Sequence, residues 1–375
     1  MSSRSTRLQD HFCDLTDPRR RKVVYPLINI VTIAICAVIA GADDFVSIAA
    51  WGGQKRDWLA TILDLRNGIP SHDRFNAIFA ALDPGEFEKC LLSWITALHE
   101  ITSGQVVAID GKTLRGSFDK ASGKSAIHMV SAWATANHIS LGQLVVDEKS
   151  NEITAIPKLL EILDISGCLV TIDAMGCQRE IARQIVDAKA DYVLAVKDNQ
   201  PKLHAAINDF FTRQLEDDLR SVPHRKHETH ERGHGRRDDR YYYLAKLPED
   251  FPLAQHWSGL KAIGMAVRVT EHDDGRASDD VRYYITSCYP SGQRFAEAVR
   301  GHWGIENSLH WQLDVTFQED QCRVRKGHAD ANFSLLRRAS LSLLKNNKTE
   351  KVGVKNKRLC AAWNDDYRLQ VLTGA

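Results

Sequence analysis

The sequence predicts an α/β protein with a mixed-sheet core, a helical N-terminal domain and a β-rich insertion. Three observations support this class. Apolar residues recur at helical spacing through residues 1–100, short apolar strand-like runs alternate with helical stretches over 104–198, and aromatic and β-branched runs recur over 199–294. Helical spacing returns in 295–375, which we expect to complete the core. These four ranges are the predicted domains, and we expect 199–294 to leave the core as a separate lobe.

The composition is that of an ordinary globular protein. The chain has 375 residues, of which 43% are hydrophobic and 26% are charged, and its formal net charge is +1. Eight cysteines are present, but no two form a C-x-x-C pair and no zinc-ribbon spacing occurs. We therefore expect reduced, mostly buried thiols in a cytoplasmic protein.

One apolar segment near the N-terminus resembles a secretory signal. Residues Pro26–Ala42 are apolar, follow a basic cluster and end in an Ala-x-Ala pattern. Asn29 and Thr32 interrupt the run, and it is short for a bilayer span of roughly 20 residues. We expect a buried core helix here, and no membrane partner.

The core region has a recognisable order of elements. Three consecutive strand-like runs are followed by a helix, a strand, a second helix and a last strand. This is the order of a ribonuclease H-like core. The predicted strands are Val106–Asp110, Ala126–Thr135, Ile139–Glu148, Cys168–Ala174 and Asp191–Lys197, and the first predicted helix is Asn151–Leu163.

Two of these apolar runs end in an aspartate. "VVAIDGKT" ends its run at Asp110 and "LVTIDAMG" at Asp173. A carboxylate at a strand end lies on a rigid support at the sheet rim, where it suits a divalent ion that keeps water or phosphate as further ligands. Taken alone, each is also compatible with an ordinary strand end or a helix N-cap, but the matched pair on the first and fourth strands favours a shared metal site.

Glu306 is the candidate third acid. At helical spacing, it shares a helix face with His302 and His310. The H-E-x-x-H spacing of a zinc protease is absent. A solvated surface position is the other interpretation, but nearby apolar residues indicate a packed helix; these are Trp303, Leu309, Trp311 and Leu313.

Positive charge is unevenly distributed along the chain. Eleven Lys or Arg residues lie in the stretch Arg323–Arg358, opposed only by Asp330 and Glu350, and a second basic run spans Arg19–Lys22. Clustered positive charge is typical of a surface that contacts a phosphate backbone. It is equally compatible with a solvated face that has no partner.

Several long motifs resemble one protein family. They are "AIDGKTLRGS", "VDEKSNEITAIPKLLEILDI", "TIDAMGCQREIA", "DYVLAVKDNQ", "RYYITS" and "HWGIENSLHWQLDVTFQEDQCRVRKG". The sequence resembles the H-repeat-associated proteins and related insertion-sequence transposases, from "DPRR" near residue 17 to the C-terminal "VLTGA". The resemblance implies a ribonuclease H-like domain with a β-rich insertion before a third acid.

The resemblance also implies a function and a site. The family's catalytic Asp, Asp and Glu correspond to Asp110, Asp173 and Glu306, which would bind two Mg²⁺ or Mn²⁺ ions. The expected partners are double-stranded DNA with terminal inverted repeats and target DNA, and a homodimer on DNA is compatible with them. The candidate DNA-binding residues are Lys112, Arg115, Arg300, His302, Arg323, Arg325 and Lys326.

One part of the family pattern is missing. The broader transposase group places Tyr seven residues before the Glu, Arg four before it and Lys seven after it. Here these positions hold Val299, His302 and Leu313. That pattern therefore does not assign the residues that grip the DNA phosphates.

Three functions are compatible with the sequence. An active transposase would nick element ends and join them to target DNA. A non-catalytic relic would only bind DNA, although all three acids are present. A structure-selective nuclease would use the same core, but the helical N-terminal domain and the long insertion favour end recognition and assembly.

Overall fold

The computed structural model describes residues 5–20, 23–99, 105–114, 127–146, 152–233 and 235–374. The chain divides into two compact units. The helical unit comprises residues 1–102, 111–148 and 306–375, and the sheet unit comprises residues 103–110 and 149–305. The chain therefore passes between the units four times, after residue 102, after Asp110, after residue 148 and before Glu306.

The strands follow the predicted order. They belong to one nine-stranded sheet, with the order β3-β2-β1-β4-β5-β9-β8-β7-β6. Strands β1 and β4 are parallel, as are β4 and β5, whereas β2 and β3 are antiparallel. The mixed α/β class is confirmed. The core strands are β1 (Val106–Leu114), β2 (Ile127–Ala134), β3 (Ile139–Val146), β4 (Leu169–Ile172) and β5 (Asp191–Val196).

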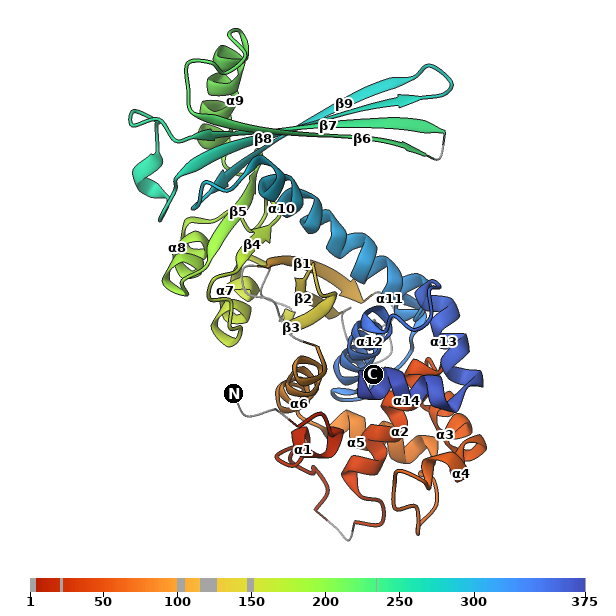
Figure 1. Cartoon of the computed structure of the whole chain (residues 1–375). Helices are drawn as coiled ribbons and strands as arrows, with labels where there is room; N and C mark the ends of the chain where they lie inside the picture. Colours follow the sequence, from red (N-terminus) through yellow and green to blue (C-terminus); the bar gives the residue numbers. More distant parts are fainter. Residues whose placement is uncertain are drawn as a thin grey trace. The chain divides into compact units, whose positions relative to one another are not determined.

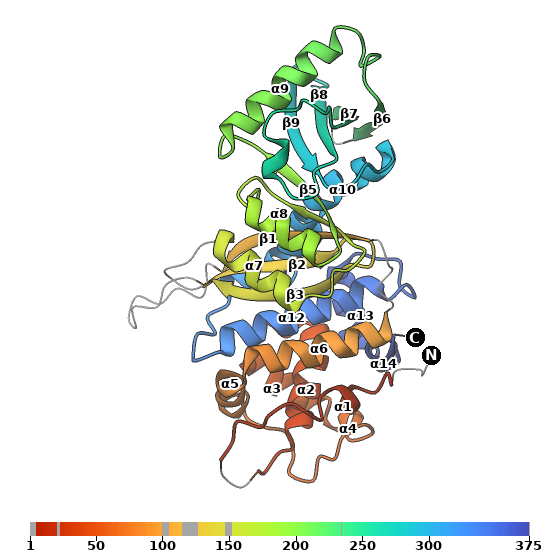
Figure 2. The same ribbon diagram turned by 90° about the vertical axis from the view of Figure 1, so that its left-hand side faces the viewer.

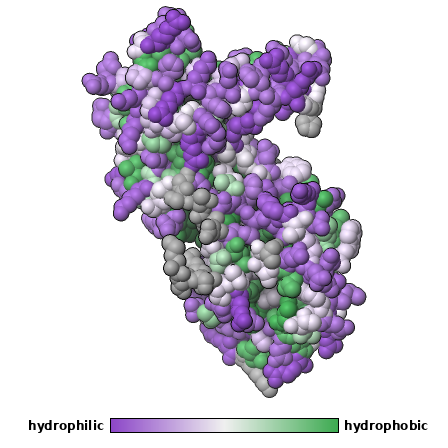
Figure 3. Space-filling model, viewed as in Figure 1, coloured by the Kyte–Doolittle hydropathy of each residue, from purple (hydrophilic) through white to green (hydrophobic). Residues whose placement is uncertain are grey.

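The region 199–294 is β-rich, as predicted, but it is not detached from the core sheet. Strand β9 pairs antiparallel with β5 along Val193–Val196, so the insertion extends the core sheet. In Figure 1 its strands extend as long ribbons, and Figure 3 shows a largely hydrophilic surface over them. The elements are α9 (Pro201–Leu215), β6 (His224–Gly233), β7 (Arg236–Lys246), β8 (Ala262–His272) and β9 (Ala277–Thr286).

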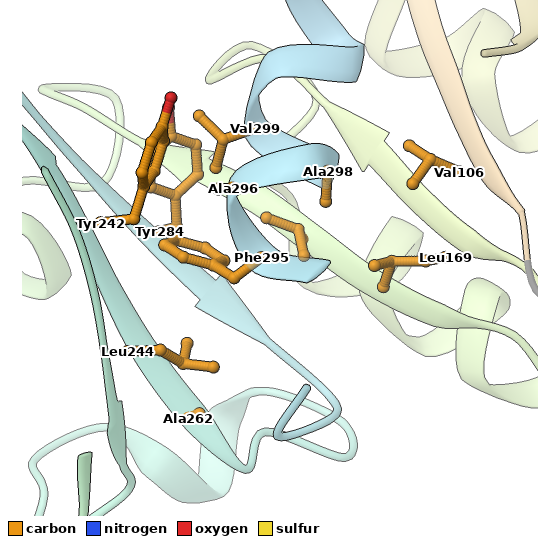
Figure 4. Close-up of a cluster of buried hydrophobic side chains, with 11 residues drawn as sticks. Val106, Leu169, Tyr242, Leu244, Ala262, Tyr284, Phe295, Ala296, Ala298 and Val299 are labelled. Carbon is orange, nitrogen blue, oxygen red and sulfur yellow. The ribbon is translucent and has the colours of Figure 1, made fainter. Parts of the chain in front are cut away.

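Helix α10 (Gly292–Ile305) covers one face of the sheet unit. Phe295 is fully buried and packs edge-on against Tyr242 and Tyr284 (Figure 4). It also lies directly over Gly264, where an added Cβ would come within 2.4 Å of the Phe295 ring. The lack of a side chain at Gly264 thus lets the helix approach β8 closely. Two further helices of this unit are α7 (Glu152–Ile162) and α8 (Arg179–Asp187).

The helical unit is organised around α12 (Ala329–Asn346), which contacts α2, α5 and α6. Figure 2 shows α6 and α12 side by side. Buried Asn332 donates to the carbonyl oxygens of Phe79 (2.8 Å) and Leu82 (3.0 Å) where α5 ends. The N-terminal helices are α1 (Leu8–His11), α2 (Leu27–Ile39), α3 (Phe45–Gln54), α4 (Arg56–Leu59), α5 (His72–Ala81) and α6 (Pro84–Leu98). The C-terminal helices are α11 (Trp311–Val315), α12, α13 (Val354–Trp363) and α14 (Asp365–Thr373).

The apolar N-terminal segment forms the expected core helix. Helix α2 is buried along nearly its whole length, from Asn29 to Ile39. Asn29 is buried too, and its amide donates to the Asp64 carbonyl at 2.7 Å. Over the residues described, no helix has both the length and the apolar character needed to cross a membrane.

Candidate active site

Asp110 and Asp173 occupy equivalent positions on neighbouring strands. In the parallel pair β1–β4, Ile109 is in register with Ile172, and each aspartate is the next residue along the chain. Neighbouring strands lie about 4.8 Å apart. Both aspartates are partly exposed, whereas the residues before them are buried. The prediction that these two strands are adjacent and parallel is confirmed. Asp173 directly follows the last residue of β4, but β1 continues past Asp110 to Leu114, so the prediction that Asp110 ends its strand is wrong.

The loop after Asp173 is held by two side chains that the sequence analysis did not single out. The amide of Asn199 donates to the Ala174 carbonyl, and that of Gln200 donates to the Cys177 carbonyl at 3.0 Å. Within the loop, the Gly176 amide donates to Asp173 Oδ1 at 3.2 Å. The motif "DNQ" after β5 thus fixes the loop that carries the second aspartate. The signal is present in the sequence, since "DYVLAVKDNQ" is one of the motifs behind the family resemblance.

His302 on α10 lies near Asp173. Burial lowers the pKa of His302, although the Asp173 carboxylate and a backbone hydrogen bond at Thr171 oppose that shift. Its Nδ1 is buried and has no hydrogen-bond partner within the described residues. A neutral imidazole beside a carboxylate does not neutralise phosphate. The DNA contact predicted for His302 stays a prediction, and the structure adds that this side chain lies near the second aspartate.

Glu306 is exposed and is the first residue of a π-helical segment, Glu306–His310, that directly follows α10. Segments of this kind are rare and are frequent at functional sites. The π turn breaks the simple helical spacing on which the shared face of His302, Glu306 and His310 was predicted.

The packing of this stretch is also only partly as predicted. Leu309 and Leu313 are fully buried, but Trp303 and Trp311 are 40% and 53% exposed. The Arg282 guanidinium stacks on the Trp303 ring, 4.0 Å from its centroid.

The three acids belong to two separate units. Asp110 and Asp173 are part of the sheet unit, whereas Glu306 begins the last segment of the helical unit. In the described part of the chain, no group of three His, Cys, Asp or Glu side chains is arranged to hold a metal ion. Strand register makes Asp110 and Asp173 neighbours, and the participation of Glu306 in the same site stays a prediction.

Lys112 was predicted to contact DNA, but it is buried. Its Nζ pairs with Asp314 and, at 2.8 Å, with Glu319. An amine enclosed by two carboxylates is not available to phosphate. The structure therefore contradicts the predicted DNA contact. The sequence did not indicate this pairing, because the two acids lie about 200 positions later in the chain.

Two further candidate DNA-binding residues are Arg115 and Arg300. Arg115 lies outside the described residues. Arg300 is exposed and pairs with Glu231 at 2.6 Å, and the hydrogen bond from Arg300 is the main cause of the lowered pKa of Glu231. A surface pair of this kind contributes little to stability, so Arg300 can exchange its partner for a phosphate.

Arg323, Arg325 and Lys326 lie on the wall of a cavity of about 550 Å³ in the helical unit. Arg323 and Lys326 are exposed, and Arg325 is partly buried. The end of this loop is fixed to α5, because the His328 amide donates to the Ala80 carbonyl at 3.0 Å. The three cations are thus presented from an anchored loop. The cavity is also lined by Asp43, Asp44, Phe45, Val46, His72, Asn76, Gln318, Gln321, Cys322 and Val324.

Much of the remaining basic stretch faces inward. Arg337, Arg338, Lys357 and Arg358 are all buried. The interpretation of the whole stretch as one DNA-facing surface is therefore wrong. In the second basic run, Arg19 bonds to Asp17 and to the Tyr25 carbonyl, and residues 21–22 lie outside the described residues.

Known proteins match this chain over nearly its whole length. Residues 101–343 match the family model described as "Transposase DDE domain", and residues 9–95 match the model described as "DDE_Tnp_1-associated". The chain belongs to the DDE transposase family, and its sheet is a ribonuclease H-like fold.

Its relatives include proteins from Escherichia coli. It is 42% identical to the "Putative transposase YncI" of strain O157:H7, over 97% of this chain and 94% of that protein. It is 38% identical to the "H repeat-associated putative transposase YhhI" of strain K12, over 98% of both chains. The "Inactive transposase YbfQ" of strain K12 is 40% identical over only 18% of this chain.

Proposed function

We propose that this protein is an active transposase that cleaves DNA at the ends of an insertion sequence and joins the freed ends to target DNA. The observation that carries the proposal is that Asp110 and Asp173 directly follow the paired residues Ile109 and Ile172 of the parallel strands β1 and β4. Membership of the DDE transposase family supports the same reaction class.

The donor set fits a hard divalent cation. Two partly exposed carboxylates on rigid neighbouring strands offer oxygen ligands and leave room for water and DNA phosphate, as Mg²⁺ and Mn²⁺ require. We assign Asp110 and Asp173, with Glu306, as the ligands of two such ions. The chemistry supplied by bound ions is activation of a water or a DNA 3′-hydroxyl and stabilisation of the leaving oxygen.

The protein's own residues provide position and charge. The carboxylates of Asp110 and Asp173 would act as metal ligands and would position the reacting phosphate only through the bound ions. Neither would form a covalent bond to DNA. Asn199 and Gln200 hold the loop of Asp173 in place. His302 lies near Asp173, and burial lowers the pKa of its imidazole, which favours the uncharged form beside the aspartate.

Glu306 is proposed as the third ligand because of where it stands in the chain. It follows α10, which packs against β4, the strand that precedes Asp173. The π segment that begins at Glu306 is a second indication of a functional position.

DNA is the proposed partner, as terminal inverted repeats and as target. The exposed loop residues Arg323 and Lys326, with Arg325, are proposed phosphate contacts, and Arg300 is another. We propose that the helical domain of residues 1–100 recognises element ends, that two copies act together on DNA, and that the protein resides in the cytoplasm with the nucleoid.

The test is a cleavage assay with purified protein, Mg²⁺ or Mn²⁺, and a duplex that carries the flanking inverted repeat. Asp110→Asn, Asp173→Asn and Glu306→Gln keep side-chain size but remove a charge that a metal needs. Each should abolish cleavage while end binding stays nearly unchanged. Asp191→Asn is a matched control, since Asp191 begins β5 at the opposite rim of the sheet and its carboxylate accepts from Ser287 Oγ at 2.7 Å.

The other two functions are outcomes of the same assay. Wild-type protein that binds the repeat but never cuts it, with either metal, would make the chain a binding relic. Cleavage of branched DNA without regard to the repeat would make it a structure-selective nuclease. Loss of cleavage in Asp191→Asn as complete as in Asp173→Asn would remove the special role of the aspartate pair.

A further inference from the structure

We propose that Lys112 is a positioning residue for Asp110, acting through a largely buried ion cluster that ties strand β1 to helix α12. The cluster consists of Lys112, Asp314, Glu319, Ser334 and Arg338. This inference rests on the proposed function, because it assigns a role in holding the first metal-binding aspartate.

The cluster is a continuous chain of polar contacts within the helical unit. Lys112 Nζ donates to Glu319 Oε2 at 2.8 Å and pairs with Asp314. The other oxygen of Glu319 accepts from Ser334 Oγ at 2.8 Å. Ser334 Oγ in turn accepts from Arg338 Nε at 3.4 Å. The residues come from β1, α11, the turn Glu319–Gln321 and α12, so the cluster joins four elements.

Lys112 and Asp110 are linked by strand geometry. Side chains at alternate positions of a strand lie on the same face, so these two residues share one face of β1. The rise along a strand is about 3.3 Å per residue, so the two positions are about 6.6 Å apart. Since a paired strand is stiff, fixing Lys112 also limits the movement of Asp110.

Glu319 is held in its ionised form by the cations around it. Burial alone would raise the pKa of Glu319, but the nearby cations Lys112, Arg338 and Arg337 lower it to about 2. Glu319 is itself buried, so it depends on these partners for its charge. Removal of the Lys112 amine would take away the largest favourable charge interaction of the buried Glu319 carboxylate, and the turn that carries Glu319 would shift toward water.

The chain provides a matched control lysine. Lys357 is buried to a similar extent, 6% exposed against 8% for Lys112. Its Nζ donates to the carbonyl oxygens of Leu344 (2.9 Å) and Asn347 (2.6 Å) where α12 ends. These bonds hold the end of α12 and do not involve β1, so replacing Lys357 tests the effect of removing any buried lysine.

The experiment compares the wild-type protein with Lys112→Met and Lys357→Met, using two readouts. The first is hydrogen exchange in the peptide that covers Val106–Leu114. The second is the Mn²⁺ concentration that gives half-maximal cleavage of repeat DNA, measured beside repeat binding. We expect Lys112→Met to raise exchange in this peptide about tenfold and to raise the Mn²⁺ requirement about tenfold, with repeat binding nearly unchanged.

Lys357→Met should lower the melting temperature but change both readouts less than about twofold. If Lys112→Met does not fold, Glu319→Gln takes its place, and the same changes are expected because it removes the charge opposite Lys112. Lys112→Arg, which keeps the positive charge, should restore part of the exchange protection.

Two results would overturn the inference. One is a folded Lys112→Met or Glu319→Gln protein with wild-type exchange in Val106–Leu114. The other is an equal change in Lys357→Met. If the wild-type protein cleaves no DNA, the proposed function fails, and the exchange measurement still decides whether the cluster fixes β1.

Discussion

At the scale of single residues, the most informative feature is how many charges are buried. Lys112, Arg338 and Arg358 are all buried and hydrogen-bonded to protein groups, although Lys112 was a candidate DNA contact and the two arginines belong to a basic stretch expected at the surface. A local count of charge cannot reveal burial, because the partners come from distant segments. Arg358, for example, donates to the carbonyl oxygen of Val38 at 3.0 Å. A cluster of basic residues in this sequence therefore does not by itself identify a surface.

Glu88 is a partly buried acid whose raised pKa can be tested by the pH dependence of stability. It lies on α6 and accepts a hydrogen bond from the Gln143 backbone amide at 2.6 Å. Burial raises its pKa to about 7, while the Gln143 amide and Arg338 oppose the shift. The pKa in the folded protein is above that of the unfolded chain, so its contribution to stability is complete below about pH 4.5 and is lost as the pH rises through 7.

We therefore predict that Glu88→Gln stabilises the protein relative to the wild type at pH 8 but not at pH 5. One pKa unit corresponds to about 1.4 kcal/mol, so the difference is at most about 3 kcal/mol. Urea unfolding of both proteins at the two pH values measures it. A stability difference that does not vary with pH would show that Glu88 keeps an ordinary pKa.

At the scale of elements, the close approach of α10 to β8 is the feature most sensitive to a small change. Gly264→Ala would place a Cβ within 2.4 Å of the Phe295 ring, which packs against Tyr242 and Tyr284. We predict a decrease of about 1–3 kcal/mol in unfolding free energy. Because α10 leads to Glu306, cleavage should fall as well. The double variant Gly264→Ala with Phe295→Leu should regain part of the stability, and an unaffected Gly264→Ala protein would show that α10 packs less closely.

Substitutions can distinguish the role of the loop Arg323–Lys326 in DNA binding from the role of the buried arginines in stability. Replacing Arg323, Arg325 and Lys326 with Ala should weaken DNA binding for all sequences. It should also flatten the salt dependence of binding, by about 0.9 in log–log slope for each phosphate that the loop no longer neutralises. Stability should change little. Arg358→Met should instead cost about 3–5 kcal/mol of stability, because it leaves Asp43 and buried carbonyl groups without their partner.

The slope and the unfolding free energy are measured on the same proteins. If the triple variant binds DNA with an unchanged salt dependence, the loop does not contact DNA phosphates and is an ordinary solvated surface.

Elements with a strong apolar pattern were predictable, and others were not. The runs that end in Asp110 and Asp173 form strands because buried parallel strands are continuously apolar. Strand β6 was missed, since His224–Gly233 has no apolar alternation and lies mostly exposed at the sheet edge. The π segment at Glu306–His310 was missed as well, because residue spacing alone does not distinguish a π turn from an α-helix.

At the scale of the whole molecule, the division into units was the least predictable feature. Sequence order suggested four consecutive domains, yet α11–α14 fold in one unit with the N-terminal helices. Contacts such as Asn332 to Phe79 join positions about 250 residues apart, and no local pattern encodes them. The pairing of β1 with β4 was predictable because the order of elements is that of a known core, whereas the ties around Lys112 were not.

The central claim is that Asp110, Asp173 and Glu306 hold one pair of divalent ions. The most direct measurement is a structure of the protein with Mn²⁺ and a repeat-end duplex, in which anomalous scattering locates the manganese. We predict two manganese ions roughly 3.5–4 Å apart, with carboxylate oxygens of all three acids as ligands. Manganese bound at other residues, or a Glu306 carboxylate that contacts neither ion in the DNA complex, would contradict the account.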